Sequence, residues 1–270
     1  MKKKEVQDKI RSNKKKWITF GIGVALLAVG IILTIVTRTG AIMEGAVNGA
    51  KIPFALGLIM ILLGIVIPLV GAMPEKRTTD VRTLSLAALF AALCYIGFTY
   101  CKIDIPVGME KTAFHLGNVF CVLAALFLGG LWGGMAGAVG MTIADLTTAY
   151  VTSAPKTFLL KLCIGLITGF VAHKVFKLSQ DKEDRKIPIT AATAISCAAG
   201  MGFNIVADPL VGYFYKMYVL GVPQEAANIW AKIGAVTTSV NAVVAVVAAT
   251  VLYVALRKAM KRSNLLPKLS

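Results

Sequence analysis

Two long runs without any charged residue, at 17–37 and 53–73, constrain this chain more than any other feature. A helix needs about 20 mostly apolar residues to cross the hydrocarbon core of a bilayer, and each run meets that length. Backbone polar groups in that core must be bonded inside the protein, and a barrel would instead show short strands of alternating hydrophobicity. We therefore expect an all-α integral membrane protein.

Six further apolar segments predict additional spans, at 83–100, 114–128, 135–149, 157–171, 187–211 and 233–256. The total is about eight. The run GGLWGG at 129–134 predicts a tight turn between the fourth and fifth spans, and 102–111 is expected to be a polar loop. With a cytoplasmic N-terminus, the cytoplasmic segments would hold eight, three, five and five of the 29 Lys and Arg residues. The positive-inside rule then places both termini in the cytoplasm of a multi-pass cell-membrane protein.

A polar break at 74–80 suggests how the chain is divided. We expect residues 1–79 to form a basic tail with an extra pair of transmembrane helices. Residues 80–262 are expected to form a six-helix substrate-binding membrane domain, and 263–270 a cytoplasmic tail.

Composition excludes several classes of protein. Charged residues make up 16% of the chain, against about 25% in soluble proteins. The net charge of +16 lies in short basic runs without interleaved aromatic residues, which anionic lipid headgroups explain better than nucleic acid does. The five cysteines form no C-x-x-C pair and the two histidines are far apart, so no metal site is expected. No ATP-binding or metalloprotease motif is present, and we expect neither catalytic residues nor a cofactor in this chain.

Ionisable side chains inside the spans cost about 2.5–3.5 kcal/mol each at the bilayer centre, so each needs a reason. The predicted topology gathers them in the extracytoplasmic half. One interpretation is interfacial ion pairing, for instance Asp145 with Lys156 or Lys161, with the tyrosines forming an aromatic belt. The other is an outward-opening polar pocket for a small, flat, polar ring compound, lined also by Tyr213 and Tyr215. The candidate binding residues are His115, Asn118, Asp145, Tyr150, Lys156, Lys161, Asn204 and Asp208.

Small residues recur at four-residue spacing in several predicted spans. This spacing places them on one stripe of a helix and lets two backbones approach closely. Such stripes serve either packing within the chain or a flat face for a partner subunit. The pairs are Ala87 with Ala91, Ala88 with Ala92, Gly130 with Gly134, Gly133 with Gly137 and Gly165 with Gly169.

Residues 80–262 resemble the S components, the substrate-capture subunits, of energy-coupling factor (ECF) vitamin transporters. The resemblance is carried by the Ala-rich helix after a basic segment (82–92), FHLGN (114–118), LFLGGLWGG (126–134), the stretch 144–150, and APKTFLLK (154–161) leading to Gly165. The spacing of the six spans also matches. The pair of spans at 17–73 departs from the usual six-helix form.

The resemblance implies a subunit of an ATP-driven importer that binds a B vitamin or vitamin precursor in an outward-facing pocket. It implies as partners a transmembrane coupling subunit, docked on Ala87 and Ala91, and two ATPases that use the ATP. It is closest to the branch for riboflavin, hydroxymethylpyrimidine, pyridoxine and pantothenate, and does not choose among them. Lys111, Lys156 and Lys161 could favour an anion unless nearby acids neutralise them. Alternatives from other classes are a stand-alone ion-coupled carrier and an intramembrane enzyme using Asp145 and Asp208.

Overall fold

The computed structural model describes residues 17–36, 57, 60–61, 64, 67–68, 80–107, 110–180 and 187–263. The chain forms two compact units, Met1–Arg77 with Phe214–Gln224, and Thr78–Tyr213 with Glu225–Ser270. In the first unit, the predicted first span is a helix at Trp17–Val36. Most of the predicted second span and the predicted C-terminal tail lie outside the described residues.

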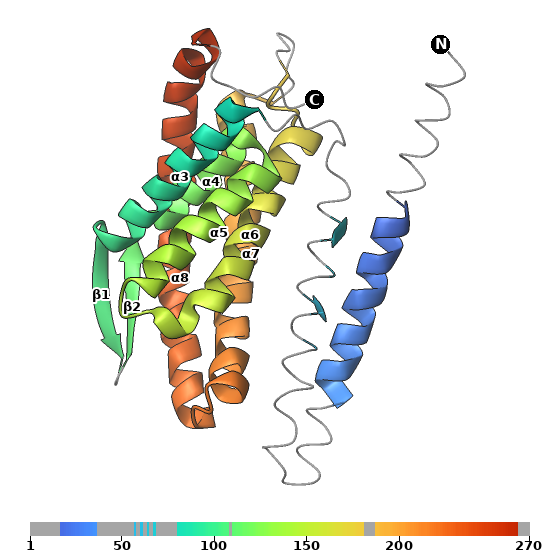
Figure 1. Ribbon diagram of the computed structural model, residues 1–270, viewed down its shortest axis with the longest axis vertical. Coiled ribbons are helices and arrows are strands. Elements are labelled where there is room, and N and C mark those ends of the chain that lie inside the picture. Colours follow the sequence, from blue (N-terminus) through green and yellow to red (C-terminus); the bar gives the residue numbers. More distant parts are fainter. Residues whose placement is uncertain are drawn as a thin grey trace. The chain divides into compact units, whose positions relative to one another are not determined.

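The helices that follow residue 80 form a bundle with a small hairpin at one end (Figure 1). Five helices of the described part of the chain are long and apolar enough to cross a membrane. The prediction of an all-α membrane protein is therefore confirmed. The helices of the bundle are α3 (Val81–Thr99), α4 (Gly117–Leu128), α5 (Gly130–Leu146), α6 (Ala154–Phe170), α7 (Ile189–Phe214) and α8 (Gln224–Arg262).

The prediction of a loop at 102–111 is wrong. Strand β1 (Lys102–Val107) pairs antiparallel with β2 (Glu110–His115), with Lys102 opposite His115 and Ile103 opposite Phe114. Polar and apolar residues alternate along KIDIPV, which gives the hairpin two different faces. The hairpin also takes residues 114 and 115 from the predicted fourth span, so that helix α4 begins only at Gly117.

The turn between α4 and α5 is shorter than the glycine run predicted. Only Gly129 leaves the helical conformation, with a φ of 78° that favours glycine. The next five residues already belong to α5. A Cβ atom added to Gly133 would overlap the backbone of Ala125 in α4. The small-residue stripe therefore packs α5 against its neighbour within this chain, as the first interpretation of these motifs held.

Helix α4 is the centre of the bundle. All of its residues except Phe120 are buried, as expected for a helix that is apolar on every side. Its 12 residues span about 18 Å at 1.5 Å per residue, well short of a hydrocarbon core of about 30 Å. Helix α4 therefore covers only part of the depth that the longer helices span.

Candidate functional site

Contacts between helices show how far along the bundle each polar residue lies. The Cys121 thiol of α4 donates to the backbone carbonyl of Lys161 in α6, with a sulfur–oxygen distance of 3.8 Å. Asn118 lies one turn from Cys121 on the hairpin side. These contacts place the Asn118 carboxamide and Lys161 in neighbouring layers of the bundle.

Helix α7 is placed in the same way. Gly200 packs closely against Ile164 and Thr168 of α6. Farther along α7, Asp208 meets Lys156 near the start of α6. Asn204 lies one turn from each of these two contacts, and therefore at the depth of Lys161.

Lys156 and Asp208 form an ion pair that ties α6 to α7. The Lys156 Nζ atom is 2.8 Å from Asp208 Oδ1, and the Thr238 hydroxyl of α8 donates to Oδ2 at 2.9 Å. Both carboxylate oxygens are thus bonded, and three helices meet at one acid. The side chains of Lys156 and Asp208 are only 15% and 24% exposed, so the pair is much less screened than a surface ion pair.

Asp145, at the end of α5, is 2% exposed and feels the charges of Lys156, Lys161 and Asp208. Its Oδ2 atom has no hydrogen-bond partner among the residues that the structure describes. Among the described residues, no ion pair joins Asp145 to a lysine within 4.0 Å. The interpretation that Asp145 pairs with Lys156 is wrong, because Lys156 pairs with Asp208.

Three further buried polar atoms lack a partner in this region. They are Oδ1 of Asn118, Oδ1 of Asn204 and Nδ1 of His115. Asn118 and Asn204 are 2% and 1% exposed. A buried polar atom without a hydrogen bond costs about 1–3 kcal/mol, and native proteins leave few of them. Such atoms on β2, α4, α5 and α7 indicate a place where a bound molecule supplies the missing hydrogen bonds.

We name as the polar cluster seven of the eight predicted binding residues, which the structure brings together at the hairpin end of the bundle. Their electrostatic interactions link the titratable members to one another. Their role as substrate contacts stays a prediction. The members are His115, Asn118, Asp145, Lys156, Lys161, Asn204 and Asp208.

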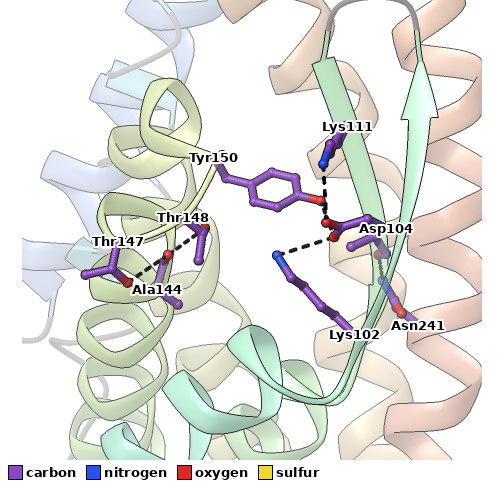
Figure 2. Close-up of polar contacts among 9 residues, drawn as sticks. Lys102, Asp104, Lys111, Ala144, Thr147, Thr148, Tyr150 and Asn241 are labelled. Atoms are coloured by element: carbon purple, nitrogen blue, oxygen red, sulfur yellow. Dashed lines mark hydrogen bonds and ion pairs between the residues drawn. The ribbon is translucent and has the colours of Figure 1, made fainter.

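The eighth predicted residue, Tyr150, binds the hairpin. Its hydroxyl donates to Asp104 Oδ1 at 2.9 Å, and Figure 2 shows Lys102 and Lys111 reaching the same carboxylate, at 3.3 and 3.9 Å. The Lys102 ammonium also lies 4.9 Å from the centre of the Tyr150 ring. Burial and the bond to Asp104 raise the pKa of Tyr150 above its ordinary value. The phenol therefore stays a donor at neutral pH.

Helix α8 supplies three site residues that the sequence analysis missed. The Asn241 carboxamide accepts from the backbone N–H of His115 and donates to the carbonyl of Ala113, both at 3.0 Å. The Thr237 and Thr112 hydroxyls share a hydrogen bond of 3.2 Å, and Thr238 bonds Asp208. A signal was present, because positions 237, 238 and 241 share one face of an otherwise apolar helix.

The formal charges of the polar cluster balance. Two aspartates, Asp145 and Asp208, stand against two lysines, Lys156 and Lys161. His115 is neutral, because burial of the imidazole, together with the nearby charge of Lys161, lowers its pKa below the ordinary value. The cluster therefore offers an ion no overall electrostatic attraction.

The remaining predicted residues are placed differently. Ala87 is buried, and Ala91 lies with its backbone against Gly140 of α5. The exposed alanines of α3 are instead Ala88 and Ala92. Tyr213 is partly buried at the end of the second unit. Tyr215 belongs to the other compact unit.

Comparison with known families accounts for the bundle. A family model described as the S component of the ECF-type riboflavin transporter matches residues 78–258, which include all of the hairpin and nearly all of helices α3 to α8. No curated protein and no solved structure gives a significant match. The small-molecule substrate and the coupling and ATPase partner subunits follow from the family, as does a role in transport and not in catalysis. The chain belongs to the ECF-type riboflavin transporter S component family and is a membrane-embedded, substrate-binding subunit.

Proposed function

We propose that this chain captures riboflavin, or a neutral ring compound closely related to it, at the polar cluster and delivers it to the coupling subunit. The observation that carries the proposal is the set of buried, unpartnered atoms of Asn118, Asp145 and Asn204. Each carboxamide offers one acceptor and two donors, which suits the imide edge of a flavin ring. The Asp145 carboxylate suits the hydroxyl groups of a sugar-alcohol chain.

The charge balance favours a neutral substrate. Lys156 is neutralised by Asp208 at 2.8 Å, and Lys161 interacts with both Asp208 and Asp145. Lys111, the third lysine that could attract an anion, is 3.9 Å from Asp104. A phosphate or carboxylate entering this site would meet two acids, with Lys156 and Lys111 already beside their own carboxylates, and would lose its hydration.

The purified protein should bind riboflavin with a Kd of micromolar or below, on the order of −8 kcal/mol, without ATP, because the partner ATPases use the ATP. The phosphate ester of riboflavin adds a charge of about −1.5 to −2 and should bind at least about tenfold more weakly. Quenching of flavin fluorescence measures both constants. Pantothenate and pyridoxine, tested by thermal shift, complete the panel. If no compound binds, substrate capture is contradicted, and preference for an anion contradicts the neutral-ligand proposal.

Replacing Asn118 or Asn204 by leucine tests whether each side chain binds the ligand or stabilises the fold. Asn118→Leu and Asn204→Leu remove a buried polar group that has no partner at Oδ1, so the melting temperature should stay the same or rise. Riboflavin affinity should fall about 10–100-fold, because each change removes about 1–3 kcal/mol of hydrogen bonding.

Asn241→Leu is the matched control. It removes a carboxamide that makes two hydrogen bonds to β2 and should lower stability by about 1–3 kcal/mol. Thermal unfolding of all three variants in one detergent makes the comparison. A loss of stability in Asn118→Leu and Asn204→Leu as large as in the control would show that the two amides are structural.

The coupling subunit is proposed to dock on α3. The predicted pair Ala87 and Ala91 faces the inside of the bundle, and Ala88 and Ala92 form the exposed part of the Ala-rich stripe, beside Leu89 at 55% exposure. The double variant Ala88→Trp with Ala92→Trp should prevent close helix contact and so reduce co-purification with the coupling subunit. Its affinity for riboflavin should stay the same. Val247→Trp, at an exposed position of α8, is the control. Undiminished co-purification would contradict docking on this face.

We further propose eight spans with both termini in the cytoplasm. The basic residues support this orientation, because Lys174 lies in the helical turn that follows α6 and Lys261 in the last turn of α8, and both helices end on the side of the bundle away from the hairpin (Figure 1). A fluorescent protein fused to the C-terminus should fold and fluoresce. Alkaline phosphatase should be active there if the orientation is reversed.

A further inference from the structure

A cavity bordered by the hairpin and α8 lies beside the polar cluster. Its volume is about 400 Å³. Because residues alternate between faces, the cross-strand pair Ile103 and Phe114 lies on the face opposite Lys102, Asp104 and Lys111. We name this cavity the outer groove. Its lining includes Tyr100 and Lys102 at the start of the hairpin, the pair Ile103 and Phe114, and Val240 and Val244 of α8.

The outer groove meets the polar cluster along the contact between β2 and α8. His115 and Asn241 line the groove, and His115 is also a member of the cluster, with Nδ1 buried and unpartnered. Along this contact, Asn241 bonds His115 and Ala113, and Thr237 bonds Thr112. Hydrogen bonds of this kind can be exchanged for bonds to water or to a polar ligand at little net cost.

We infer that the outer groove is an encounter subsite, where the apolar end of the substrate ring binds before the polar end reaches the cluster between β2 and α8. This inference rests on the proposed function. The groove lies within the range of about 300–1,000 Å³ typical of small-molecule sites. Two aromatic residues, Tyr100 and Phe114, line it, and its continuity with the cluster through His115 identifies the substrate itself as its occupant.

Filling the groove tests this order of events. Val244 is 39% exposed and lines the groove, so Val244→Trp should obstruct it without entering the polar cluster. An obstructed path slows entry and exit alike. In stopped-flow fluorescence, riboflavin association and dissociation should both slow by about tenfold, with Kd unchanged, whereas altered contacts in the bound state would act mainly on dissociation. Val243→Trp, on the neighbouring exposed position outside the groove lining, should leave both rates unchanged.

A second measurement uses the native sequence. Cys101 lines the groove and is exposed, whereas the other four cysteines are buried. A bulky methanethiosulfonate reagent should therefore modify Cys101 alone and slow association and dissociation as Val244→Trp does. A reducing agent should restore both rates, and Cys101→Ser should be insensitive to the reagent.

Unchanged rates in both the variant and the modified protein would overturn the encounter subsite and leave the proposed function intact. So would a weaker Kd caused by faster dissociation, because the groove would then belong to the final bound state. Failure of the unmodified protein to bind riboflavin would overturn the proposed function, and this inference with it.

Discussion

Asp208→Ala should destabilise the protein by about 2–4 kcal/mol, somewhat below the cost of breaking a fully buried pair. The change leaves the Lys156 ammonium without its partner at 2.8 Å and removes the acceptor of the Thr238 hydroxyl. Lys156 is 15% exposed, so water replaces the lost carboxylate only in part. The affected groups lie on α6, α7 and α8, and the loss should appear as a lower melting temperature in detergent.

The double variant Lys156→Met with Asp208→Leu provides the control. It removes both charges and keeps apolar volume, which is often neutral for a buried pair. We expect it to regain at least half of the stability lost in Asp208→Ala. A double-mutant cycle with the single variants Lys156→Met and Asp208→Leu gives the coupling energy. If Asp208→Ala melts like the unmodified protein, the pair is as weak as one on an open surface.

Much of the site could be predicted because an ionisable residue in an apolar segment has a high free-energy cost and is therefore easy to recognise. Asp145, Lys161 and Asp208 stand out in the sequence, since each interrupts a run that otherwise suits lipid. Helical periodicity then places them toward one end of their helices. The lengths of the apolar runs predicted the helices for the same physical reason, namely the thickness of the bilayer.

The partners of these residues could not be predicted, because they depend on the relative register of the helices. Lys156 could reach Asp145 or Asp208 from sequence alone. The choice is fixed by the packing of Gly200 against Ile164 and Thr168, which brings Asp208 beside Lys156. Side-chain chemistry does not encode that register.

The hairpin escaped prediction for a related reason. Two strands alone are marginally stable in water, so the alternation at 102–107 is a weak signal. Its stability comes from distant residues, namely Asn241 and Thr237 on α8 and Tyr150 beyond α5. The same three uncharged residues connect the hairpin to the helices that carry the polar cluster.

A close contact between α5 and α6 predicts the second large effect. A Cβ atom added to Gly165 of α6 would overlap the backbone of Gly134 in α5. No rotation of a flexible side chain can relieve that overlap, because the obstructing atoms are backbone. Gly165→Ala must therefore push α5 and α6 apart, and we expect a loss of about 3 kcal/mol or more, at the upper end for overpacking.

Gly202→Ala isolates the steric cause. Gly202 lies inside α7, is exposed, and a Cβ atom added there would meet nothing within 4 Å. Alanine favours the helix over glycine by about 0.8–1 kcal/mol, so this variant should melt at or above the temperature of the unmodified protein. The same substitution should thus change the melting temperature in opposite directions at the two positions. At Gly165, the cost of separating the two backbones outweighs the gain in helix propensity. Equal melting temperatures for the two variants would contradict the close approach of α5 and α6.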